Sequence, residues 1–71
     1  MTNTKRLEQK IRDSGKKISF LADKLGLSYN GFRNCVTNKA EFKASHIQIL
    51  CQELNIDLEE MQVIFFAERG A

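Results

Sequence analysis

The sequence predicts a single, all-helical domain, and three observations support that fold class. First, the 71 residues include no proline and only four glycines, a composition that favours helices over a β-sandwich with many turns. Second, apolar residues recur at spacings of three and four along most of the chain, as on one face of a helix. Third, residues that begin or end helices stand between these apolar stretches. A chain of this length holds one domain, so we assign residues 1–71 to it.

The helix boundaries follow from capping residues. The expected helices run from about Thr4 to Ser14, Ser19 to Leu25, Tyr29 to Val36, His46 to Leu54, and Leu58 to Ala67. Gly15 and Gly26 end the first two helices, because glycine adopts the left-handed backbone that follows many helices. Asn55 ends the fourth. Ser28, Ser45 and Asp57 are expected to cap the third, fourth and fifth helices with their side-chain oxygens.

The apolar residues of these segments predict one shared core. Its expected members are Leu7, Ile11, Phe20, Leu21, Ala22, Leu25, Leu27, Phe32, Cys35, Val36, Phe42, Ile47, Leu50, Cys51, Leu54, Ile56, Leu58, Met61 and Phe65. The last helix is more apolar than one buried stripe requires. Val63, Ile64 and Phe66 are expected to remain partly outward. They belong either to a fully buried closing helix or to a patch for self-association or a partner.

Charge is divided unevenly along the chain. Residues 1–43 carry ten Lys or Arg and four Asp or Glu, whereas residues 44–71 carry one Arg and five acids. A basic first half is suited to a surface that faces nucleic acid. The acidic second half should avoid phosphates and is free for other contacts.

Several functional classes are disfavoured by composition. No apolar run approaches the ~18 residues of a membrane span, and the polar N-terminal segment predicts no secretory signal. We therefore expect a cytoplasmic protein that has no membrane partner. Cys35 and Cys51 are read as reduced core residues, with a disulfide or metal pair as the alternative. The lone His46 is expected at the surface, so neither a metal site, a cofactor nor an enzyme is predicted.

The most informative stretch is Ile18 to Val36. Two short helices that cross steeply need a small residue where they touch, and Ala22 supplies it. They also need a turn residue that tolerates a positive φ angle, which Gly26 supplies. The run from Ala22 through Leu25-Gly26-Leu27 to Ser28, followed by polar residues and Phe32, resembles the helix-turn-helix of the Cro/CI repressor superfamily, also called the XRE family. The resemblance covers most of the chain and implies a compact five-helix, lambda-repressor-like DNA-binding domain.

The resemblance also implies which residues meet double-stranded operator DNA. The second helix of the motif would enter the major groove and read base edges. The matching solvent-facing positions are Ser28, Tyr29, Asn30, Arg33 and Asn34. An arginine fork suits guanine, and an asparagine amide suits adenine. Phosphate contacts are expected from Lys17, Ser19, Thr37, Asn38, Lys39 and Lys43.

One departure from the family pattern opens a second hypothesis. The family commonly has Gln at the first position of the motif and often at the start of the reading helix, where this chain has Ile18 and Tyr29. Together with Phe20, these residues would form a partly apolar surface. The first hypothesis, which follows from the resemblance, is a phage-type transcriptional repressor that occludes a promoter. The alternative is an antirepressor that binds a phage CI-type repressor. A homodimer or heterocomplex would use Ile18, Phe20, Tyr29, Val63, Ile64 and Phe66.

Overall fold

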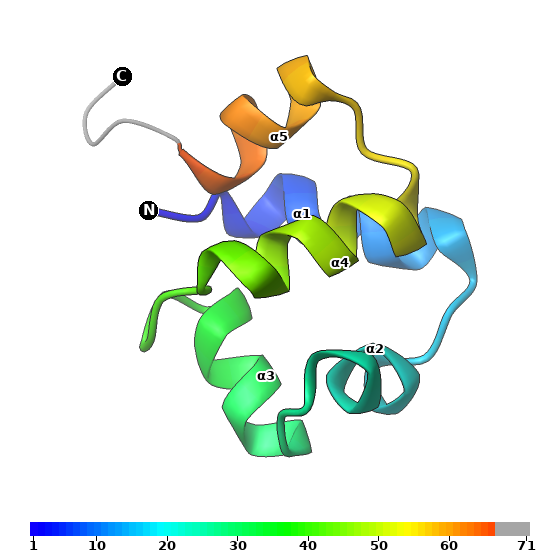
Figure 1. Ribbon diagram of the computed structural model, residues 1–71, viewed down its shortest axis with the longest axis vertical. Coiled ribbons are helices and arrows are strands. Elements are labelled where there is room, and N and C mark those ends of the chain that lie inside the picture. Colours follow the sequence, from blue (N-terminus) through cyan, green and yellow to red (C-terminus); the bar gives the residue numbers. More distant parts are fainter. Residues whose placement is uncertain (67–71) are drawn as a thin grey trace.

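The computed structural model describes residues 1–66, which form five α-helices and no strand (Figure 1). The helices are α1 (Thr4–Ser14), α2 (Ile18–Leu25), α3 (Tyr29–Val36), α4 (Ala44–Leu54) and α5 (Leu58–Phe65). The predicted all-helical class is therefore confirmed. The bounds of α1 and α3 are those expected, and α2 begins one residue earlier than expected.

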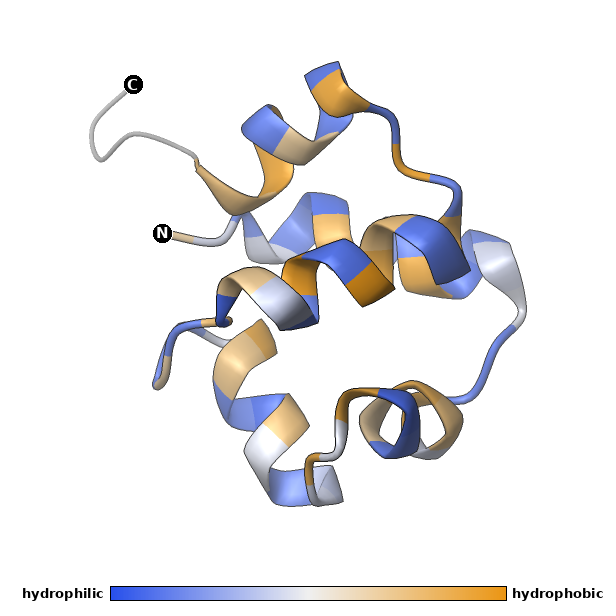
Figure 2. Ribbon diagram, in the orientation of Figure 1, coloured by the Kyte–Doolittle hydropathy of each residue, from blue (hydrophilic) through white to orange (hydrophobic). Residues whose placement is uncertain are grey.

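The helices pack around a core in which α4 is central. It contacts α1, α2 and α5, while α3 packs against α1 and α2. In Figure 1, α5 lies at one end of the molecule, and α2 and α3 lie at the other. Hydrophobic and hydrophilic positions alternate in bands along each helix (Figure 2), as expected for helices with one buried face. Leu7, Leu21, Phe32 and Leu50 are completely buried.

The N-terminal arm, residues 1–3, ties the two ends of this arrangement together. The backbone N–H of Asn3 donates to the carbonyl of Ile64 in α5 at 2.6 Å. The Asn3 side chain caps α1 by accepting from the N–H of Arg6 at 3.2 Å. Thr2 is buried, with 8% of its surface exposed. The arm is therefore part of the packed structure between α1, α3 and α5.

The predicted start of the fourth helix is wrong by two residues. Helix α4 begins at Ala44, with Lys43 rather than Ser45 in the capping position. The reason is His46, whose Nδ1 accepts from the backbone N–H of Lys43 at 3.2 Å. This bond closes the first turn from within, so Ser45 becomes an ordinary exposed residue of the helix. The imidazole can accept there only while Nδ1 carries no proton.

Helix α5 also differs from the prediction. Its buried residues are Ile64 and Phe65, with Met61 half-buried. Leu58, expected in the core, is 68% exposed, whereas Ile64, expected partly outward, is 1% exposed. Ile56 occupies the core just before the helix, and the Asp57 cap then turns Leu58 outward. The helix ends at Phe65, and the expected end at Ala67 lies outside the described residues.

The two cysteines contribute to the core as free thiols. Cys35 is buried and Cys51 is half-buried. Burial raises the pKa of the Cys35 thiol and of the Cys51 thiol above the usual value. Since the thiolate is the reactive form, both positions favour packing over nucleophilic chemistry.

Within residues 1–66, no helix combines the length and the apolar character needed to cross a membrane.

Candidate nucleic-acid interface

The α2–α3 pair is built on a tight turn centred on Gly26. This residue has a φ of 72°, and its N–H bonds to the carbonyls of Ala22 and Asp23 at the end of α2. The N–H of Leu27 reaches the Ala22 carbonyl at 2.9 Å. A side chain at position 26 would find open space, but the left-handed backbone itself disfavours any residue other than glycine. Leu27 then packs against the core and fixes where the next helix starts.

Ser28 begins α3 as predicted. Its Oγ accepts from the backbone N–H of Gly31 at 3.0 Å, which satisfies one of the free donors of the first turn. Asp57 does the same for α5, accepting from the N–H of Glu60 at 2.8 Å. The Glu60 carboxylate forms an ion pair with Lys10 of α1 at 2.9 Å. For α3, the Gly26 turn before the helix and the Ser28 cap together fix where the helix starts.

Helix α3 has one buried face and one polar outer face. Phe32, Cys35 and Val36 are buried in the core. The opposite face carries the residues predicted to read bases, which are Ser28, Tyr29, Asn30, Arg33 and Asn34. Four of them are exposed and Arg33 is half-buried. Among residues 1–66, no hydrogen bond or ion pair involves the Arg33 guanidinium.

The residues predicted to contact phosphates lie around the ends of this pair. Lys17 precedes α2, Ser19 is in its first turn, and Lys39 and Lys43 are in the segment between α3 and α4. All four are exposed. Lys17 stands at the α2 N-terminus without a side-chain cap. Its ammonium therefore adds to the positive end of the helix dipole, which attracts anions.

Thr37 and Asn38 are already engaged within the protein. The Thr37 hydroxyl donates to the Arg33 carbonyl at 2.8 Å. The Asn38 side chain accepts from the Thr2 N–H at 2.9 Å and donates to the Thr2 carbonyl at 2.8 Å. These side chains hold the end of α3, a role that the sequence did not reveal. Sequence reasoning likewise missed Thr2, because a threonine near a terminus carries no signal of burial.

The predicted apolar surface on α2 and α3 is less continuous than expected. Ile18 is half-buried and packs against the core, whereas Phe20 is 41% and Tyr29 55% exposed. Phe20 was also expected in the core and is not there. Two ammonium groups lie beside its ring, that of Lys16 at 5.8 Å and that of Lys24 at 5.5 Å from the centroid. Such cations favour the electron-rich ring of an aromatic residue that remains at the surface.

Lys16 also links the segment between α1 and α2 to α4. Its ammonium donates to the Glu53 carbonyl at 2.8 Å and to the Glu53 carboxylate at 2.9 Å. The hydrogen bond from Lys16 lowers the pKa of the Glu53 carboxyl against the opposing effect of its desolvation. The positive charge of Lys16 is thus held at a fixed place beside Phe20.

A second surface is formed by α5, at the far end of the molecule. Val63 is 45% and Phe66 57% exposed, so both lie outward as expected. Ile64 does not belong to this surface, because its side chain is buried in the core. Leu58, which was expected in the core, joins the exposed set instead. We use the term α5 patch for Val63 and Phe66, which are three residues apart and share one side of the helix end.

The described residues thus define a small all-helical domain in which a glycine turn joins α2 to α3 and the outer face of α3 is polar. Comparison with known proteins assigns the chain to no family. No family model matches it, and no curated protein or solved structure is significantly similar.

Proposed function

We propose that this chain is a DNA-binding transcriptional regulator of the phage repressor type, acting in the bacterial cytoplasm. The observation that carries the proposal is the outer face of α3. Four polar side chains with base-reading chemistry, those of Tyr29, Asn30, Arg33 and Asn34, share this face. A rigid turn and a serine cap precede it. This is the arrangement that a helix needs to lie in a major groove.

The charges around α3 support the same function. Lys17, Lys39 and Lys43 are exposed at the helix ends and at the following segment, where phosphates would flank a helix seated in the groove. The acidic residues Asp57 and Glu59 are on the α5 side, at the opposite end of the molecule. A duplex approaching α3 would therefore meet these lysines and avoid the acids of the α5 end. Repression would follow from occupying the promoter.

The direct test is a binding titration with double-stranded DNA. The probes are the sequence flanking the gene and sequences selected from a random pool, at low and near-physiological salt, with random DNA as competitor. We expect a tight complex that survives both salt and competitor. Binding that disappears with salt and shows no sequence preference would represent only the electrostatic attraction of any basic protein, and would overturn the proposal.

A second candidate function is an antirepressor that binds a CI-type repressor. The exposure of Phe20, Tyr29 and the α5 patch favours it, because an exposed aromatic in a small domain is suited to anchor a partner. Adding this chain to a complex of a neighbouring repressor with its operator tests it. Release of the repressor, with no complex between this chain and DNA, would favour the antirepressor.

The α5 patch is also the proposed contact of a homodimer. Two copies related by a two-fold axis would present the same patch to each other. Paired copies of α3 could then read half-sites about one helical turn apart.

A further inference from the structure

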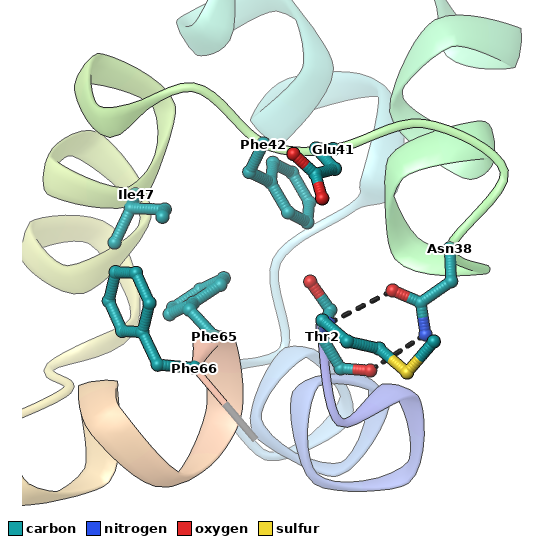
Figure 3. A pocket seen from close by; sticks show the side chains of 8 residues that line it. Thr2, Asn38, Glu41, Phe42, Ile47, Phe65 and Phe66 are labelled. Carbon is teal, nitrogen blue, oxygen red and sulfur yellow. Dashed lines mark hydrogen bonds between the residues drawn. The ribbon is translucent and has the colours of Figure 1, made fainter. Parts of the chain in front are cut away.

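A pocket lies between the N-terminal arm, the segment that joins α3 to α4, and the end of α5 (Figure 3). It has a volume of about 280 Å³ and is partly open to solvent. Its lining residues are Met1, Thr2, Asn38, Glu41, Phe42, Ile47, Phe65 and Phe66. Pockets for drug-sized molecules begin at about 300 Å³, so this one fits only a small ligand.

Three phenylalanines form the aromatic part of the pocket wall. The rings of Phe42 and Phe65 meet edge to face, with centroids 5.6 Å apart. Phe42 also packs edge to face on Phe32 of α3, at 6.0 Å. Phe65 is buried, whereas Phe66 is 57% exposed beside it. The rings of Phe42 and Phe65, packed on each other, and the exposed ring of Phe66 form an apolar wall that a small hydrocarbon group can contact.

Glu41 is the lining residue whose side chain carries a charge; Met1, which bears the N-terminal ammonium, also lines the pocket, and within residues 1–66 the two form no ion pair. Figure 3 shows it next to Phe42, on the other side of the pocket from Phe65 and Phe66. It is exposed, and neither of the two ion pairs among residues 1–66 includes it. A carboxylate attracts a cation, and so do the faces of aromatic rings. The charge and the walls therefore favour the same kind of ligand.

We propose that this pocket binds a small organic amine, with the ammonium group at Glu41 and an apolar body against Phe42, Phe65 and Phe66. The site is distinct from the outer face of α3, and binding to it does not require that the chain bind DNA. It borders the Thr2–Asn38 hydrogen bonds that hold the end of α3 (Figure 3).

The test is an NMR titration of the whole ¹⁵N-labelled chain with three probes of nearly equal shape. 2-Phenylethylamine carries a positive charge, 2-phenylethanol none and phenylacetate a negative one. We expect the amine to shift the amides of Phe42, Ile47 and Phe65, and to bind at least about fivefold more tightly than the alcohol. Phenylacetate should bind most weakly. Equal affinities, shifts elsewhere on the chain, or a preference for phenylacetate would overturn the proposal.

Two variants locate the interactions. Glu41→Gln should lower the affinity for the amine to that of the alcohol and leave the alcohol unchanged. Phe66→Ala should weaken the amine and the alcohol alike. Both side chains are exposed, so neither change is expected to disturb folding. An amine affinity that Glu41→Gln leaves intact contradicts the site. The comparison of the three probes on the unmodified chain decides the proposal even without the variants.

Discussion

The side-chain amide of Asn38 bonds to both backbone groups of Thr2, accepting from its N–H at 2.9 Å and donating to its carbonyl at 2.8 Å. The two residues are 36 positions apart, so this pair joins the end of α3 to the N-terminal arm. Asn38 also has a φ of 66°, in the left-handed region that asparagine tolerates better than most residues. One residue thus supplies both the turn after α3 and the connection to Thr2.

Substitutions of Asn38 separate these two contributions. Asn38→Gly keeps the favourable backbone and loses two hydrogen bonds, each contributing about 0.5–1.5 kcal/mol to the free energy of unfolding. Asn38→Ala loses the same bonds and adds about 1–2 kcal/mol of backbone strain, part of which is offset by the greater entropy of unfolded glycine. We expect the alanine variant to be about 1 kcal/mol less stable than the glycine variant, measured by urea unfolding.

Asn55 provides the matched control. It has a φ of 55° at the end of α4, and within residues 1–66 its side chain makes no hydrogen bond. Asn55→Gly should therefore change the free energy of unfolding by less than about 1 kcal/mol. If Asn38→Gly were equally mild, the bonds to Thr2 would contribute little to stability.

The cap of α3 can be tested against a serine that does not cap. Ser28→Ala removes the oxygen that accepts from Gly31, and should lower the free energy of unfolding by about 0.5–2 kcal/mol. Ser45→Ala, within the first turn of α4, should leave stability nearly unchanged, because Lys43 and His46 close that turn. Thermal unfolding followed by circular dichroism measures both. Equal losses would mean that Ser45 has a capping role that the structure does not show.

The two serines also show why helix starts were only partly predictable. Ser28 follows Gly26 and Leu27, so three independent signals agree on where α3 begins. Ser45 had no such support. The cap of α4 depends on an imidazole reaching back to the Lys43 N–H, and histidine is rare in that role. Local sequence therefore predicted the existence and type of each described helix, while the start of α4 depended on a side-chain conformation that residue type does not specify.

The outer face of α3 was predictable for a different reason. Phe32, Cys35 and Val36 mark one side of a helix, so Tyr29, Asn30 and Arg33 had to lie on the other. The pattern could not reveal two tertiary features. One is the pair of hydrogen bonds between Asn38 and Thr2, and the other is the burial of Ile64 in the core where Leu58 was expected. On a helix as short as α5, apolar residues surround the axis, and only the packing of α1 and α4 decides which are enclosed.

Arg33 is predicted to read sequence. Arg33→Ala should weaken specific DNA binding by about 1–3 kcal/mol and relax the preference at one base pair. Arg33→Lys is the matched control, because it keeps the charge and loses the planar fork that suits guanine. It should retain nonspecific binding and lose specificity. Fluorescence anisotropy with specific and random duplexes measures both effects. An Arg33→Lys variant with unchanged specificity would remove Arg33 from the base-reading set.

Lys39 is predicted to contact a phosphate instead. Lys39→Ala should weaken specific and random DNA about equally and reduce the salt dependence of binding by about one unit of slope. The measurement is the affinity across a range of salt concentrations. A loss confined to the specific duplex would indicate that Lys39 reads bases.

Val63 and Ile64 are neighbours in α5, one exposed and one buried, and we expect opposite effects when each is substituted. Val63→Lys should leave the fold intact, because Val63 is 45% exposed, and should abolish self-association if the patch joins two copies. Ile64→Ala should lower the free energy of unfolding by about 2–5 kcal/mol, because it leaves a cavity where the side chain is 1% exposed. Sedimentation equilibrium and thermal unfolding separate these effects. Unfolding of Val63→Lys would show that Val63 belongs to the core.

The ion pair between Lys16 and Glu53 predicts a pH dependence with a definite sign. Lys16 lowers the pKa of Glu53 below its usual value of 4.5. A carboxyl whose pKa is lower in the folded chain adds stability above the pKa of the unfolded chain, and loses it as pH falls through the folded value. Glu53→Gln should therefore be less stable than the unmodified chain at neutral pH. The difference should disappear in acid. Because both side chains are partly exposed, added salt should also reduce it. Melting temperatures of both proteins, measured from neutral pH down into acid, test the sign. A difference in stability that grows in acid would contradict it.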